Sequence, residues 1–134
     1  MNLYILGKLK KEDKRAVAIA VIGSGLNVIY PPENKKLAEE ISKNGALVSG
    51  FPYGTKPEGK NFLARNQLIV KLSKAVLVIE GKARSGTIST ANHAANDGVE
   101  VFAIPGSEAT DYLIENGATP VQKAFEIVDY LDTL

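Results

Sequence analysis

An apolar run followed at once by a glycine-rich turn constrains the fold of this chain most strongly. The run Ala16–Ile22 is apolar throughout and rich in β-branched residues, which is typical of a strand buried on both faces of a parallel sheet, although periodicity alone leaves a helix open. Gly23-Ser24-Gly25 ends this element, and Pro31-Pro32 places a proline near the first turn of the next helix. The sequence therefore predicts a strand, a glycine turn and a helix in succession.

Such a turn has two interpretations. Backbone N–H groups exposed there, close to a helix N-terminus, can bind phosphate or another anion. The turn lacks the dinucleotide fingerprint, because Val28 stands at the third glycine position, and it is no Walker A loop, because no Gly-Lys-Ser/Thr follows. Anion binding and a purely structural turn both remain open from these residues alone.

Length and composition bound the class of protein. The 134 residues suffice for one domain, 1–134, with a real core. No run is long and apolar enough to cross a membrane, and Met1–Tyr4 is too polar for a signal peptide, so we expect a cytoplasmic protein without a membrane partner. The absence of cysteine excludes disulfides and thiolate metal sites. Because the net charge is only +1, nucleic-acid binding would require a local cluster of Lys and Arg.

Strand and helix patterns alternate along the chain. Apolar spacing predicts helices over 33–43, 62–73, 85–95, 111–116 and 123–134, and apolar runs predict strands over 3–6, 46–49, 75–80, 99–104 and 117–121. We expect a three-layer, Rossmann-like α/β fold with a mostly parallel sheet of about five strands. The turns at 23–25, 50–54 and 85–87 should then share the rim at the carboxyl ends of the strands. The apolar stripe of the last helix should pack on the sheet, with a dimer contact as the alternative.

The loop 50–61 combines aromatic and basic residues. Its aromatics either anchor the loop to the core or offer faces on which bases stack, beside lysines that meet phosphates. Asn61 and Ser85 are candidate helix caps, and Asn44-Gly45 is a typical C-terminal stop of the helix over 33–43. Arg65 would be a bidentate phosphate partner if it were buried or faced a cleft, and a plain solvated arginine otherwise.

Catalytic and metal-binding patterns are weak. A carboxylate at a strand end such as Glu80 more often holds a loop N–H or a lysine than acts as a general base. His93 has no second ligand nearby in sequence, and Ser85, Thr87 and Ser89 lack a nucleophile elbow. We therefore expect no metal site and no cofactor.

Three segments together resemble the DNA-processing protein A family (DprA/Smf). They are Gly-Ser-Gly-Leu-Asn-Val-Ile-Tyr-Pro-Pro-Glu-Asn at 23–34, Phe-Pro-Tyr-Gly-Thr-Lys-Pro at 51–57 with Asn-Phe-Leu-Ala-Arg-Asn-Gln-Leu-Ile at 61–69, and Glu80 with Ser-Gly-Thr-Ile-Ser-Thr-Ala at 85–91. Pro-Gly-Ser at 105–107 also matches the family. Within the second segment, Leu63 replaces a family proline and Gln67 a family arginine. The resemblance extends from Tyr4 to Leu131.

One large gap interrupts the resemblance near the N-terminus. After Tyr4–Gly7 the family continues with a Gly-Ser-Arg turn, a helix, a second strand and a further glycine turn, whereas here Ala16–Ile19 runs directly into Ala20–Gly23. The chain therefore resembles a family member truncated in the N-terminal β-α-β part of the domain. The family arginine that meets DNA phosphates is lost with that part.

The resemblance implies a binding protein rather than an enzyme. Members of the family bind single-stranded DNA, dimerise through this domain, protect incoming DNA during natural transformation and help to load the RecA recombinase. The expected partners are therefore single-stranded DNA, a RecA-type recombinase and a second copy of this chain. The residues expected to bind DNA or phosphate are Ser24, Gly25, Tyr30, Phe51, Gly54, Lys56, Arg65, Asn66, Ser85, Gly86 and Thr87.

Two alternatives belong to other functional classes. Nucleotide-binding or nucleotide-hydrolysing domains of the lysine-decarboxylase-like superfamily are similar in their glycine turns and strand-end carboxylates. Their Pro-Gly-Gly-x-Gly-Thr-x-x-Glu motif is absent, because Glu80 precedes Ser85-Gly86-Thr87 instead of following it. The other alternative is a stable remnant that no longer binds DNA and serves only as a dimerising module.

Overall fold

The structure, a computed structural model, describes residues 3–7 and 18–134. They fall into two compact units, which are described separately below: unit 1 ends at Leu68, and unit 2 is Ile69–Leu134. The predictions for Ala16, Val17 and the charged connection 8–15 lie outside the described residues.

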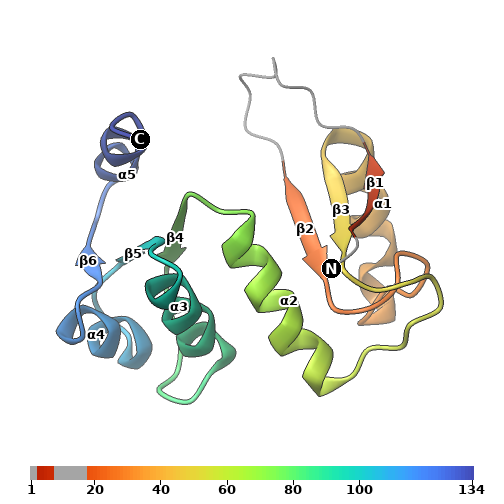
Figure 1. The fold of residues 1–134 in the computed structure, drawn as a ribbon, viewed down its shortest axis with the longest axis horizontal. Helices are drawn as coiled ribbons and strands as arrows, with labels where there is room; N and C mark the ends of the chain where they lie inside the picture. Colours follow the sequence, from red (N-terminus) through yellow and green to blue (C-terminus); the bar gives the residue numbers. More distant parts are fainter. Residues whose placement is uncertain (1–2, 8–17) are drawn as a thin grey trace. The chain divides into compact units, whose positions relative to one another are not determined.

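Unit 1 contains a three-stranded sheet (Figure 1). Its strands are β1 (Tyr4–Gly7), β2 (Ile19–Ile22) and β3 (Ala46–Ser49), in the order β1-β3-β2. The central strand β3 pairs in parallel with β2 and antiparallel with β1. All four residues of β3 are buried, as its apolar sequence predicts for a strand between two neighbours.

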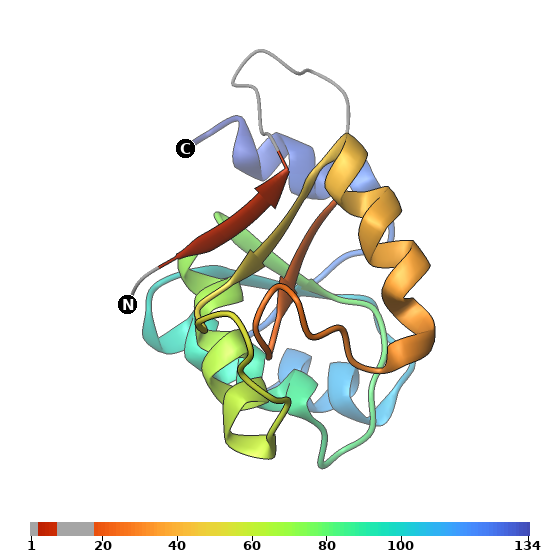
Figure 2. The ribbon, with the colours of Figure 1, turned by 90° about the vertical axis from the view of Figure 1, so that its right-hand side faces the viewer.

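Helix α1 (Lys35–Asn44) follows a single 3-10 turn, η1 (Pro32–Asn34), and covers one face of this sheet (Figure 2). Pro32 opens the turn, where a missing N–H costs no hydrogen bond. Ala38 on α1 packs with Leu26 and Leu47 in the core of unit 1. The strand, glycine turn and helix predicted for this part of the chain are therefore present.

The turn between α1 and β3 requires glycine for a reason that differs from the expected helix stop. The φ of Gly45 is −151°, so the residue does not have the positive φ of a left-handed cap. A Cβ at this position, however, would lie 1.9 Å from the backbone oxygen of Ala18. The next amide, that of Ala46, donates to this oxygen at 3.2 Å, so glycine is needed for close backbone packing.

Unit 2 contains a second, fully parallel sheet in the order β4-β5-β6. Its strands are β4 (Ala75–Val78), β5 (Glu100–Ala103) and β6 (Thr119–Pro120). Helices α3 (Gly86–Asn96) and α4 (Glu108–Glu115) pack on the face that carries Val78, Val101 and Ala103. Small side chains at Ala91 and Ala94 let α3 approach this face closely.

Helix α2 (Gly59–Lys71) contains the boundary between the units. Leu68 packs with Ala46 and Val48 in unit 1, and Val70 belongs to the core of unit 2. The helix begins at Gly59, so the prediction that Asn61 caps it is wrong: Asn61 lies within the first turn and donates through Nδ2 to the backbone oxygen of Lys56 at 3.1 Å.

The last helix, α5 (Ala124–Leu131), packs less completely than its sequence predicts. Tyr130 contacts Phe102 edge to face, with 5.4 Å between ring centroids. Val128 and Leu131, which belong to the apolar stripe, are exposed, and no residue of α5 is buried. The stripe borders an apolar groove of about 380 Å³ that Leu77 and other aliphatic residues of unit 2 line.

The α/β class with parallel strands is confirmed. The number of sheets differs from the prediction, because the six strands within the described residues are hydrogen-bonded in two groups of three and not in one sheet of about five. Helix α4 also begins three residues before the predicted 111, because Ser107 caps it: the Ser107 Oγ accepts from the Thr110 amide at 3.3 Å, and the Thr110 Oγ1 accepts from the Ser107 amide at 3.1 Å. No helix within the described residues is long and apolar enough to cross a membrane.

Candidate functional site

Two loops of unit 1, residues 23–31 and 50–58, are joined by hydrogen bonds, and we call them the paired loops (Figure 2). They leave the carboxyl ends of the parallel strands β2 and β3, so they start at the same edge of the sheet. The Gly25 amide donates to the Thr55 oxygen at 3.0 Å, and the Gly54 amide donates to the Asn27 Oδ1 at 2.7 Å. The prediction that these two turns lie together is therefore confirmed.

The glycine at position 25 permits this close approach. A Cβ on Gly25 would lie 2.5 Å from the Pro52 oxygen and 2.9 Å from the Gly54 nitrogen. Gly54 itself has a φ of +86°, which favours glycine. Gly25 and Gly54 were both expected to bind DNA or phosphate, but the amides of both already donate within the protein. These two residues therefore hold the loops together.

Two serine hydroxyls form hydrogen bonds where the paired loops leave the sheet. The buried Ser49 hydroxyl, at the end of β3, donates to the Ser24 oxygen at 2.6 Å and accepts from the Phe51 amide at 3.0 Å. The Ser24 hydroxyl donates to the Val28 oxygen in its own loop. Sequence reasoning missed Ser49, although a polar residue that ends a buried strand was a visible signal.

Arg65, on α2, is held inside unit 1. Its Nη1 donates to the Val21 oxygen at 3.2 Å, and its Nε donates to the Oδ1 of the buried Asn66 at 2.9 Å. The guanidinium carbon lies 5.6 Å from the centroid of the Phe62 ring, within the range of a cation–π interaction. Burial lowers the pKa of Arg65, but the side chain remains charged at neutral pH.

The Phe62 ring links Arg65 to an exposed aromatic. Its centroid lies 6.3 Å from that of Tyr30, with the two rings tilted by 44°. A Cβ on Gly23 would lie 2.8 Å from the Phe62 Cδ1, so the glycine leaves room for the ring. Tyr30 is 60% exposed. Phe62, which sequence reasoning did not select, thus links the predicted site residues Tyr30 and Arg65, and Asn66 is joined to Arg65 by a hydrogen bond.

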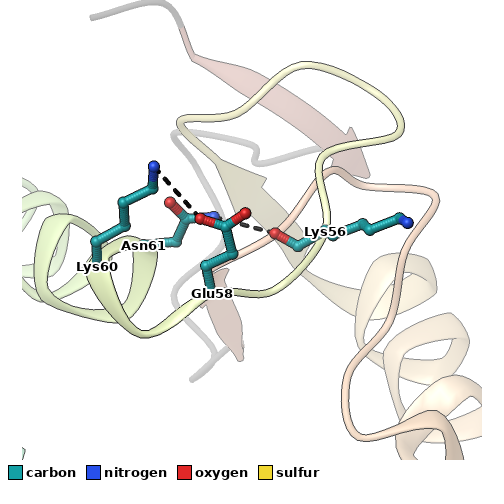
Figure 3. Close-up of polar contacts among 4 residues, drawn as sticks. All are labelled: Lys56, Glu58, Lys60 and Asn61. Carbon is teal, nitrogen blue, oxygen red and sulfur yellow. Dashed lines mark hydrogen bonds and ion pairs between the residues drawn. The ribbon is translucent and has the colours of Figure 1, made fainter.

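The second of the paired loops presents further aromatic and basic side chains to solvent. Tyr53 is 63% exposed, and Phe51 is half-buried. Figure 3 shows the Lys56 ammonium pointing away from Lys60, whose Nζ lies 3.3 Å from the Glu58 Oε2. Among the described residues Lys56 has no ion-pair partner, so its charge is available to a ligand.

In unit 2, Ser85, Gly86 and Thr87 begin helix α3 as predicted, but the expected cap is absent. Ser85 has the extended backbone of an N-cap residue, with φ −116° and ψ 162°, yet its side chain makes no cap hydrogen bond. The Ser85 Oγ is buried and has no hydrogen-bond partner in the described part of the chain. A buried hydroxyl without a partner is uncommon in folded proteins.

The loop that leads to Ser85 is held by the start of α4. The Gly81 amide donates to the Ser107 Oγ at 3.2 Å, and the Ala83 amide donates to the Glu108 Oε2 at 3.2 Å. Glu80, which was expected to hold a loop N–H or a lysine, is exposed, and Glu108 accepts from the loop amide of Ala83. Within residues 3–7 and 18–134, no three His, Cys, Asp or Glu side chains are grouped to hold a metal ion.

The chain matches the protein family described as DNA recombination-mediator protein A over residues 7–132. Protein Smf of Escherichia coli (strain K12) is 45% identical over 122 residues, which are 86% of this chain and 33% of that protein. DNA processing protein DprA of Bacillus subtilis (strain 168) is 41% identical over 119 residues, 84% of this chain and 40% of that protein. The chain therefore spans between a third and two fifths of the length of these curated relatives.

Two solved structures are similar to this chain. The X-ray structure of DprA from Streptococcus pneumoniae has a TM-score of 0.80 at 38% identity, covering 84% of this chain and 42% of that one. The structure of DprA from Helicobacter pylori has a TM-score of 0.79 at 30% identity, covering 86% of this chain and 56% of that one. The latter is described as giving insight into the single-stranded DNA binding mode of that protein.

Proposed function

We propose, starting from the fact that the chain belongs to the DNA recombination-mediator protein A family, that it binds single-stranded DNA as a DprA-type protein. Its role would lie in DNA uptake, natural transformation and recombinase loading. The observation that carries the proposal is the pair of hydrogen-bonded loops in unit 1, which present exposed aromatic faces beside Lys56, a lysine with no ion-pair partner in the described part of the chain. The similarity to a DprA whose structure is described by its single-stranded DNA binding mode supports the choice of ligand.

In this proposal the paired loops bind both the base and the phosphate of a nucleotide. Tyr30, Phe51 and Tyr53 offer ring faces on which unpaired bases stack, a contact worth about 1–3 kcal/mol per base. Lys56 lies on the same loops and neutralises a phosphate. A duplex hides its base faces, so the stacking part of the contact is specific for single strands. Ser24, Gly25, Gly54 and Asn66 hold the frame that positions these groups.

The start of α3 supplies a second phosphate contact. The free N–H groups at a helix N-terminus attract anions. The buried Ser85 hydroxyl has no partner within the described residues, and a ligand oxygen would satisfy it. Gly86 and Thr87 lie in the first turn, where their amides point toward the same ligand.

We propose a binding protein and not an enzyme, acting as one domain over 1–134 in the cytoplasm. A RecA-type recombinase and a second copy of the chain are the proposed protein partners. The truncation of the family's N-terminal β-α-β part, which the sequence indicates, would leave the paired loops as the principal DNA contact. The proposal therefore predicts weaker DNA binding than the full family domain gives.

Fluorescence anisotropy of a labelled oligo-dT, titrated at several salt concentrations beside a duplex of equal length, tests the proposal. We expect the single strand to bind better and binding to weaken steeply with salt. Lys56→Ala should lower affinity and reduce the salt slope by about 0.7, the value for one lost phosphate contact on a single strand. Lys60→Ala is the matched control, because its ammonium is already paired with Glu58.

Two outcomes would overturn the proposal. Absence of binding at low salt would favour the remnant without DNA binding. Release of a base from a nucleoside monophosphate, abolished by Glu80→Gln, would favour the nucleotide-hydrolysing alternative.

A further inference from the structure

Two of the five N–H donors of Arg65 are bonded within the protein. In a side-on bidentate contact, a guanidinium donates to a phosphate through Nε and one terminal nitrogen. In Arg65 the Nε is donated to Asn66, and Nη1 is donated to the Val21 oxygen on β2. A side-on phosphate contact would therefore have to break the bond to a buried asparagine. Leaving a buried acceptor without a partner costs about 1–3 kcal/mol, which opposes such a rearrangement.

The flat face of Arg65 is committed as well. The guanidinium carbon lies over the Phe62 ring, and the Phe62 ring in turn lies beside that of Tyr30. On another side the ring is closed in by Gly23, where even a methyl group would collide with it. Phe62 is thus confined by three neighbours. A confined ring fixes the ring beside it, so Tyr30 loses less conformational freedom when a base stacks on its exposed face.

From this geometry we infer that Arg65 is a positioning residue, which acts through Phe62 to hold Tyr30 ready for an unpaired nucleobase, and that it is not a phosphate contact. The inference rests on the proposed function, since the base would belong to the bound single strand. It assigns charge neutralisation in unit 1 to Lys56 and base stacking to the column Arg65–Phe62–Tyr30.

Arg65→Lys separates the two roles, because lysine keeps the charge but has neither the planar face nor the fork. If Arg65 neutralised a phosphate as a single charge, lysine would largely preserve the affinity for oligo-dT, and if it held the phosphate bidentately, lysine would lower the affinity equally with and without the Tyr30 ring. If it positions Tyr30, we expect an affinity loss of about fivefold to tenfold with an unchanged salt slope, at the lower end of the stacking contribution. Arg84→Lys is the matched control, since the same exchange is made at an exposed arginine of unit 2.

A double-mutant cycle with Tyr30→Ala tests whether the effect passes through the tyrosine. In the otherwise unchanged chain, Tyr30→Ala should cost about tenfold in affinity. In the Arg65→Lys background it should cost less than twofold. Equal costs in both backgrounds, or an unchanged affinity in Arg65→Lys alone, would overturn the inference. A reduced salt slope in Arg65→Lys would do the same, since it would reveal a lost phosphate contact.

Phe62→Leu is a second variant that tests the same inference if Arg65→Lys fails to fold. It removes the ring and keeps the arginine charge, so it should reproduce the affinity loss without changing the salt slope. The ring-proton chemical shifts of Tyr30, measured by NMR without DNA, provide a readout that does not depend on binding. They should move toward free-tyrosine values in Phe62→Leu and Arg65→Lys. Shifts that stay unchanged would overturn the positioning role, whereas lack of DNA binding by the unaltered chain would refute only the proposed function.

Discussion

Unit 1 and unit 2 both place a glycine turn after a parallel strand, yet they hold these turns by different means. In unit 1 two loops hold each other, through the Gly25 and Asn27 contacts with the opposite loop. In unit 2 a helix start holds a single loop, through Ser107 and Glu108. The Gly25 and Gly54 amides of the first arrangement both have partners on the opposite loop, whereas the Ser85 hydroxyl beside the second has no partner among residues 3–7 and 18–134. In unit 1 the loop amides are therefore already bonded within the protein, whereas unit 2 retains a buried polar group that could accept a further hydrogen-bond partner.

The largest expected effect on stability comes from a substitution that separates the paired loops of unit 1. Gly25→Ala would place a methyl group 2.5 Å from the Pro52 oxygen, which forces the loops apart. We expect a loss of about 1–3 kcal/mol in the free energy of unfolding, as for other overpacked sites, together with weaker oligo-dT binding. Urea denaturation measures the first effect. Gly59→Ala is the control, because a Cβ there meets nothing within 4 Å and lies in a helix. If Gly25→Ala unfolds like the unaltered chain, the loops are not held by close approach.

The equivalent support in unit 2 is Ser107. Its Oγ accepts from the Gly81 amide and from the Thr110 amide, so Ser107→Ala removes a helix cap and a loop contact at once. We expect a destabilisation of about 1–2 kcal/mol, the upper part of the range for cap removal. Hydrogen exchange should show faster opening of the Gly81 amide and no change at the Gly54 amide. Equal acceleration at both amides would break the distinction between the two arrangements.

A smaller effect is expected at Asn27, whose side chain is exposed. Asn27→Ala removes the acceptor of the Gly54 amide and should cost about 0.5–1.5 kcal/mol, the net worth of one hydrogen bond. The Gly54 amide should exchange faster, while the Gly25 amide, which donates to Thr55, should remain protected. Simultaneous loss of protection at both amides would show that the two bonds form one cooperative element.

The smallest effect concerns pH and the last helix of unit 2. Hydrogen bonds from the Gln122 amide and then the Lys123 amide lower the pKa of Glu126. A lowered folded-state pKa means that the carboxylate stabilises the start of α5 above the ordinary glutamate pKa of about 4.3, and that this support is lost as the pH falls through the lower, folded-state value. The amide signals of Gln122 and Lys123 should therefore shift in an acid titration. In Glu126→Gln that titration should disappear, while the amides of the paired loops stay unchanged in both proteins.

Local patterns predicted most of the elements. The apolar run 46–49 gave β3 with its correct bounds, and the alternation of strands and helices, together with three motifs, indicated the family that the comparisons confirm. Long-range polar contacts could not be predicted in this way. Ser49 reaches Ser24 across 25 positions, and Gly54 reaches Asn27 across 27. No periodicity connects such residues, because their meeting depends on how the strands are paired.

Several local predictions had the right position and the wrong physical reason. Gly45 ends α1, but it is needed for its contact with Ala18 and not for a left-handed cap. Ser85 stands at the N-cap of α3 without making the cap bond, while Ser107, which was not selected, makes one. In each case a residue type is compatible with two roles, and only the neighbours that tertiary structure supplies decide between them.

The close approach of the paired loops has a consequence for exchanging parts among relatives. The backbone atoms around Gly25 and Pro52 leave no room for an added methyl group. The Asn27 side chain also accepts a hydrogen bond from the Gly54 amide of the opposite loop. A loop taken from a relative would bring a backbone path fitted to its own opposite loop. Chimeric proteins should therefore tolerate the joint transfer of residues 23–31 and 50–58 far better than the transfer of either segment alone. The two segments form one structural unit that must be exchanged together, although α1 and β3 separate them along the chain.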